Sequence, residues 1–84
     1  MSEDEYWWDD SKEEIHFRES NSLFRVSRIA IADCFELPDK REAVTENFVA
    51  HWSWFRAKAR ELLSQDPDQK EFLIDSDVLQ KFLN

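Results

Sequence analysis

The chain has 84 residues, 42% of them hydrophobic, and a formal net charge of −8 at pH 7. This length allows one small domain, and the acidic balance argues against general nucleic-acid binding, which requires a net basic surface. The same balance is compatible with a basic protein partner.

Glycine is absent from the sequence. Phosphate-binding loops and the turns that expose a nucleophilic serine depend on glycine, because their backbone takes positive φ values or approaches a ligand closely. These kinds of catalytic and cofactor site are therefore excluded.

Cys34 is the only cysteine, so we expect no internal disulfide, no cysteine-based zinc site and a reducing, cytoplasmic compartment. The first residues are acidic, unlike those of a secretory signal. No apolar run approaches the roughly 20 residues that span a bilayer. The sequence therefore predicts a cytoplasmic protein that does not contact a membrane.

Residues 1–11 are expected to form an acidic, aromatic arm, followed by a single domain over residues 12–84. Residues 1–14 hold seven acids and one base, which gives this segment a net charge of −6. Met1 to Glu5 have nothing to bury and are expected to be mobile. Tyr6, Trp7 and Trp8 either fold back onto the core or bind a basic, apolar-lined groove on a partner.

The segment from Glu14 to Ser27 predicts an antiparallel hairpin. Apolar and polar residues alternate in Glu14 to Glu19 and again in Leu23 to Ser27, as in half-buried strands. The inward residues are Ile15, Phe17, Phe24 and Val26. Asn21 is expected to take the left-handed conformation in the turn between the strands.

The outer face of this hairpin would carry His16, Arg18 and Arg25, with Arg28 beside them. Such a face has two interpretations. It is either a solvated surface or a modest positive patch that binds an anion or the acidic arm of the same chain.

A short helix is predicted from Arg28 to Glu36, with Ser27 as its N-cap and Pro38 beyond its end. Asp39 is predicted to cap the next helix, because Glu42 follows it three residues later.

One long amphipathic helix from Ala43 to Ser64 is expected to organise the chain. Its apolar residues recur mostly at steps of three and four, the period of an α-helix with one buried stripe. The stripe consists of Val44, Phe48, Trp52, Phe55, Ala59, Leu62 and Leu63. We expect it to pack on the inner face of the hairpin.

Glu71 to Asp75 predicts a third short strand, and Ser76 is expected to cap a final helix over Asp77 to Leu83. The predicted order is β-β-α-α-β-α. This order is typical of an α+β fold with a small antiparallel sheet packed on one long helix.

The order and spacing of several short motifs resemble a known family. The motifs are Trp8-Asp9-Asp10, Ile15-x-Phe17, Phe24-Arg25-Val26-Ser27, a short helix ending near Phe35, and Phe48-x-x-His51 followed by Phe55, Ala59 and Leu62. Together they cover roughly residues 8–79 and resemble the YrdB-like small bacterial proteins. That family is a domain of unknown function, so the resemblance implies an α+β fold and a bacterial cytoplasmic origin, and no activity.

Two positions depart from the family pattern. Family members usually have a glycine in the hairpin turn, where this chain has Ser20-Asn21-Ser22. They often have an arginine after the helix histidine, where this chain has Trp52. If that arginine serves a family function, this protein has lost it.

Trp54 lies well away from the apolar stripe on a helical wheel, on the side that Ala50 and Ala57 share. A large aromatic among small residues is typical of a helix-to-helix contact between two copies. The alternative is that the C-terminal helix covers Trp54 within one chain.

No catalytic, cofactor-binding or metal-binding group is evident in the sequence. His51 has no histidine or cysteine three or four residues away, and a local hydrogen bond is its expected role. Cys34 lies among apolar residues and is expected to be a small core residue.

The sequence therefore favours a non-enzymatic protein-interaction module without a cofactor, and a homodimer is one form that this module can take. The partner-binding candidates are Tyr6, Trp7, Trp8, Ala50, Trp54 and Ala57. The alternative is an acidic inhibitor, of phage origin, that occupies a basic nucleic-acid-binding groove of another protein.

Overall fold

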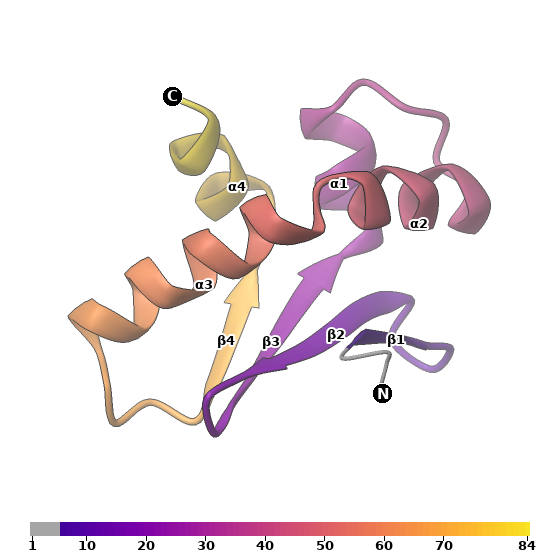
Figure 1. Cartoon of the computed structure of the whole chain (residues 1–84). Helices are drawn as coiled ribbons and strands as arrows, with labels where there is room; N and C mark the ends of the chain where they lie inside the picture. Colours follow the sequence, from indigo (N-terminus) through magenta and orange to yellow (C-terminus); the bar gives the residue numbers. More distant parts are fainter. Residues whose placement is uncertain (1–5) are drawn as a thin grey trace.

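The computed structural model describes residues 6–84, so the prediction for Met1 to Glu5 lies outside the described residues. It contains a four-stranded sheet and four helices (Figure 1). The strands are β1 (Tyr6–Asp9), β2 (Glu14–Glu19), β3 (Ser22–Ser27) and β4 (Glu71–Ile74). The helices are α1 (Arg28–Cys34), α2 (Arg41–Ala50), α3 (Trp52–Gln65) and α4 (Ser76–Leu83).

The α+β class is confirmed, but the order of elements is β-β-β-α-α-α-β-α and differs from the predicted β-β-α-α-β-α. Two changes account for the difference. An additional strand precedes the hairpin, and the long helix is divided in two. No helix in residues 6–84 is long and apolar enough to cross a membrane.

Strand β1 is formed by residues that the sequence had assigned to an arm. It pairs antiparallel with β2, and Tyr6 lies opposite Phe17. The Tyr6 ring points to the helix side, 5.5 Å from the Phe48 ring and 4.9 Å from the Trp52 ring between centroids. This contact with the core holds β1 against β2.

The sheet has the order β1-β2-β3-β4 and is mixed. The predicted hairpin β2–β3 and the predicted strand β4 are both confirmed, but β4 pairs parallel with β3. A parallel neighbour requires a crossover connection, and helices α1, α2 and α3 supply it. In the hairpin turn the left-handed residue is Ser20, with φ 57°, and the prediction of Asn21 was wrong.

The expected single helix is interrupted at His51, which has φ −111° and ψ 25°. Both the backbone N–H and the ring Nδ1 of His51 lie within hydrogen-bond distance of the Asn47 carbonyl oxygen, at 3.1 and 2.9 Å. The His51 ring also packs on Phe35, 5.1 Å away between centroids. The side-chain contacts of His51 with Asn47 and Phe35 accompany this break between α2 and α3.

Two of the three predicted helix caps were wrong. Ser27 does cap α1, because its hydroxyl accepts a hydrogen bond from the Ala30 N–H at 3.4 Å. Helix α2 begins after Lys40 without a side-chain cap, and Asp39 instead accepts a hydrogen bond from Arg28. Asp75, not Ser76, caps α4 by accepting from the Val78 N–H at 3.0 Å.

The helices lie on one side of the sheet, as Figure 1 shows, and the core fills the space between them. Phe17, Phe24 and Phe72 form a stack of rings across β2, β3 and β4, with centroids 5.2 and 4.7 Å apart. Phe48 of α2 and Phe55 of α3 cover this stack and are fully buried. The predicted contact between the apolar stripe and the inner face of the hairpin is thus confirmed.

Glu19 fixes α3 to the end of strand β2. Its carboxylate accepts hydrogen bonds from Arg56 at 3.1 Å and from Arg60 at 2.9 Å. Because Glu19 is at the edge of the core and only 10% of its side chain is exposed, these two pairs compensate for its lost hydration. They hold the turn end of the hairpin against the helix layer.

Replacing Phe48 or Phe55 by alanine should lower the free energy of unfolding by about 3–5 kcal/mol, because each change leaves a cavity in the only core of a small domain. Urea denaturation measures this change. Val49→Ala is the control, since Val49 is next to Phe48 but 45% exposed. Equal stability of Phe48→Ala and Val49→Ala would show that the packing of α2 is wrong.

Candidate functional site

The face of the sheet that points away from the helices is not covered by any other element among residues 6–84 (Figure 1). Strand pairing places one residue from each strand in a single row across it. In the order of the strands, the row is Trp7, His16, Arg25 and Leu73. Trp7 and Leu73, at its two ends, are 42% and 46% exposed. We call this surface the open face.

A network of ion pairs occupies the centre of the open face. Glu14 accepts hydrogen bonds from Arg25 at 2.9 and 3.0 Å and lies 2.9 Å from Nε2 of His16. Arg25 also donates to Glu71 at 2.9 Å. Since a carboxylate only accepts hydrogen bonds, the proton of the His16 ring that faces Glu14 must be on Nε2.

The prediction that this face carries a positive patch is therefore wrong about the charge. Arg25 is neutralised by Glu14 and Glu71, and His16 lies between Glu14 and Asp9, whose carboxylate is 3.7 Å from Nδ1. Arg18 is exposed, and no ion pair involves it among the described residues. The strand alternation correctly placed the three basic residues on one face, but the acids beside them reverse the sign of its charge.

Hydrogen bonds lower the pKa of two carboxyl groups on the open face, those of Glu14 and Asp9. Burial alone would raise the pKa of Glu14, but the hydrogen bonds from Arg25 and His16 outweigh it and hold the pKa below its ordinary value. Hydrogen bonds from the Ser11 hydroxyl and the Lys12 N–H lower the pKa of Asp9. By formal charge, with histidine counted as neutral, Asp9, Glu14 and Glu71 outnumber Arg18 and Arg25 by one.

The three aromatic residues of β1 lie on opposite sides of the sheet. Tyr6 and Trp8 are half-buried against the core, and the guanidinium carbon of Arg41 lies 5.0 Å from the centre of the Trp8 ring. Trp7 is on the open face, where its ring meets the His16 ring edge-on at 5.9 Å. Tyr6 and Trp8 thus follow the alternative in which these residues fold back onto the core. Of the three aromatic residues, only Trp7 remains exposed for contact with a partner.

Trp54 is half-buried within the single chain. Its ring lies 6.1 Å from Phe82 of α4 and 6.2 Å from Phe35, both edge-on. This arrangement matches the alternative in which the C-terminal helix covers Trp54. Ala50 and Ala57 are exposed, but the aromatic group expected between them is directed into packing within the chain.

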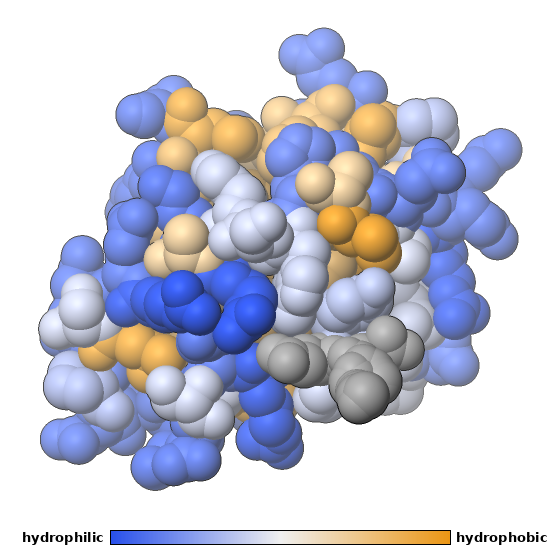
Figure 2. All heavy atoms as spheres, viewed as in Figure 1, coloured by the Kyte–Doolittle hydropathy of each residue, from blue (hydrophilic) through white to orange (hydrophobic). Residues whose placement is uncertain are grey.

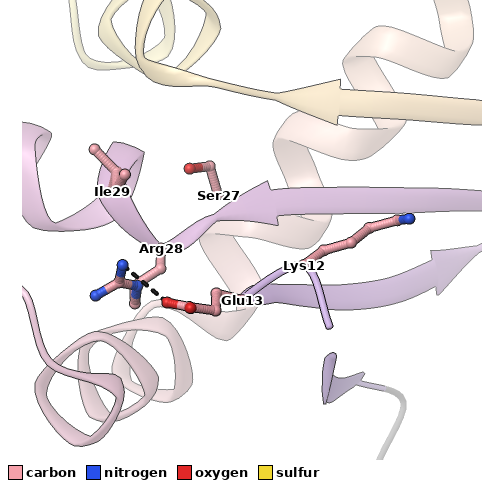
Figure 3. A pocket seen from close by; sticks show the side chains of 5 residues that line it. All are labelled: Lys12, Glu13, Ser27, Arg28 and Ile29. Atoms are coloured by element: carbon pink, nitrogen blue, oxygen red, sulfur yellow. Dashed lines mark ion pairs between the residues drawn. The ribbon is translucent and has the colours of Figure 1, made fainter. Parts of the chain in front are cut away.

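A shallow hollow of about 250 Å³ lies beside the loop that joins β1 and β2 (Figure 3). Its lining residues are Lys12, Glu13, Ser27, Arg28 and Ile29. Arg28 pairs with Glu13 at 2.9 Å and with Asp39 at 2.7 Å, and the Lys12 side chain points away from Arg28 (Figure 3). Both terminal nitrogens of Arg28 are therefore paired with carboxylates. The expectation that Arg28 contributes to a positive patch is wrong.

The side chains of residues 6–84 do not form a group of three or more His, Cys, Asp or Glu that could hold a metal ion. Burial, with a smaller contribution from the charge of Asp33, raises the pKa of the Cys34 thiol and disfavours the reactive thiolate. His51 makes the expected local hydrogen bond, to the Asn47 carbonyl.

Exposed apolar residues elsewhere on the described surface are isolated from one another. Figure 2 shows hydrophobic residues as small separate patches over the helices, divided by hydrophilic ones. Ile29 on α1, Val49 on α2 and Leu83 on α4 are 52%, 45% and 45% exposed. Single exposed apolar side chains of this kind are normal on a soluble surface and indicate no function.

The comparisons with known proteins yield no match: no family model, no curated protein and no solved structure is similar to the chain. The resemblance to the YrdB-like family therefore stays an expectation from the sequence. The open face is the candidate functional site on geometry alone. Sequence reasoning missed Glu14, Glu71 and Leu73, although the strand alternation that selected His16 also places Glu14 on the same face.

Replacing Glu14 by glutamine should lower the free energy of unfolding at pH 7 by about 1–3 kcal/mol, because Arg25 loses a charged partner. The lowered pKa of Glu14 stabilises the fold above the ordinary value of 4.5, and this contribution is lost as the pH falls through the lowered value. Glu14→Gln should therefore lose less stability between pH 7 and pH 3 than the wild type.

Urea denaturation at the two pH values tests this expectation. The control is Glu13→Gln, which removes a neighbouring carboxylate that is 58% exposed and paired with Arg28. An exposed pair of this kind contributes only about 0–1 kcal/mol. Identical behaviour of Glu14→Gln and Glu13→Gln at both pH values would contradict the network.

Proposed function

We propose that the chain is a small non-enzymatic protein-interaction module whose partner contacts the open face at Trp7. The supporting observation is the position of the Trp7 ring, which is 42% exposed at one end of the row across the sheet. Trp8, Trp52 and Trp54 are half-buried against the core. Tryptophan is the residue most enriched among interface anchors, because one ring buries a large area at low entropic cost.

The network beneath Trp7 supports the same proposal. His16 is 5% exposed and Glu14 is 8% exposed, so both are fixed under the surface by their mutual bonds and by Arg25. A rigid polar centre between two apolar ends, Trp7 and Leu73, is a surface that needs little ordering when a partner binds. We place the protein in the reducing cytoplasm of a bacterium, as the lone Cys34 and the family resemblance suggest.

A second candidate is the acidic inhibitor, which would occupy a basic nucleic-acid-binding groove of a partner. The exposed acids near β1 favour it, since Asp10 and Glu13 have side chains that are 85% and 58% exposed. The first candidate also includes a homodimer formed through the helix side. This homodimer has less structural support, because the Trp54 ring packs against Phe82 within one chain.

Replacing Trp7 by alanine should abolish partner capture while the domain remains folded, because the ring faces away from the core. Affinity capture from a native lysate compares the wild type with Trp7→Ala and Leu83→Ala. Leu83 is the matched control, since it is 45% exposed on α4 and lies outside the open face. Circular dichroism checks that each variant is folded.

The proposal requires one protein that the wild type and Leu83→Ala retain and that Trp7→Ala loses by at least tenfold. Retention of the same proteins by all three chains would contradict the assignment of Trp7. If nucleic acid displaces the captured protein from the wild type, the acidic-inhibitor candidate is favoured.

A further inference from the structure

We infer that the segment bound beside Trp7 is a basic, extended stretch of a partner protein that pairs as an additional strand with the free edge of β1. This inference rests on the proposed function, because it names the chemistry and the binding mode of the partner. The proposed function does not by itself require strand pairing, because a partner could also lie across the open face without hydrogen-bonding to the sheet.

The first argument is the position of β1 in the sheet. It is an edge strand in the order β1-β2-β3-β4 and pairs only with β2 among residues 6–84. The backbone groups on the other side of an edge strand are available to an added strand. Natural sheets often protect such edges with proline or lysine, whereas Tyr6–Asp9 contains neither.

The second argument is the charge around this edge. Asp9 ends the strand, and Asp10 and Glu13 follow in the next loop with side chains that are 85% and 58% exposed. The carboxylate of Asp9 is held by hydrogen bonds from the Ser11 hydroxyl at 2.8 Å and from the Lys12 N–H at 3.0 Å. A strand laid along this edge would thus pass these carboxylates at its Asp9 end, which favours lysine and arginine in the partner.

The third argument concerns the side chains of an added strand. Alternate residues of that strand would project on the open face, about 5 Å from Trp7 as cross-strand neighbours. A lysine or arginine there would lie near the Trp7 ring and near Asp9, and could make a cation–π contact with the ring. Apolar residues at the intervening positions would face the side of Tyr6 and Trp8.

Nuclear magnetic resonance titration of the whole chain tests this inference with synthetic peptides. The probe is a peptide of about eight residues that alternates lysine and valine, and its control has glutamate in place of lysine. We expect the lysine peptide to shift the backbone amide signals of residues 6–10 and the indole signal of Trp7, and the glutamate peptide to leave them unchanged.

Removing the exposed acids sharpens the test. Asp10→Asn combined with Glu13→Gln should weaken binding of the lysine peptide by about three- to tenfold, as expected for two exposed charges. Asp77→Asn is the matched control, because it removes an exposed acid from α4, which packs on the opposite edge strand. It should leave the affinity unchanged.

Three outcomes would overturn the inference. They are the absence of shifts with the lysine peptide at millimolar concentration, shifts centred on other acidic residues, and shifts of β1 that depend on the concentration of the protein alone. The last would identify a second copy as the occupant. None of them bears on partner capture through Trp7, so the proposed function can stand while this inference fails.

Discussion

The stack of Phe17, Phe24 and Phe72 across three strands is the interaction on which the rest of the structure depends. These rings lie 5.2 and 4.7 Å apart and bring together residues as distant in sequence as 17 and 72. A domain of this size has few alternative sources of stability, because it buries a small fraction of its chain compared with larger proteins. The helices are arranged by the need to cover this stack: Phe48 lies against Phe17, and Phe55 packs on Phe48.

The burial of this stack on one face of the sheet determines which residues lie on the other face. Side chains alternate along each strand, so the neighbours of the buried rings must point outward, and here they are Glu14, His16 and Arg25. Charged groups this close to a packed sheet are stable only when they are paired. The ion-pair network is the result, and it leaves Trp7 and Leu73 as the exposed apolar residues of the open face, with Leu23 half-buried between the charged groups.

The hairpin and its inward residues could be predicted from the sequence because Ile15, Phe17, Phe24 and Val26 show the period of a strand directly. Strand β1 could not, since three consecutive aromatic residues hide that period, and only the contact of Tyr6 with Trp52 decides its place. The break at His51 likewise depends on packing against Phe35. The sign of charge on the open face depends on the pairing of Arg25 with Glu71, which are 46 positions apart and become neighbours through the parallel strand β4.

The central claim is that β1 belongs to the sheet in a register that places Tyr6 in the core and Trp7 on the open face. Proton–proton nuclear Overhauser contacts measure this register most directly. The structure predicts contacts between the rings of Tyr6 and Trp52, whose centroids are 4.9 Å apart, and between the rings of Trp7 and His16, at 5.9 Å. Contacts of Trp7 with Phe48 or Trp52 instead, or the absence of both predicted sets, would contradict it.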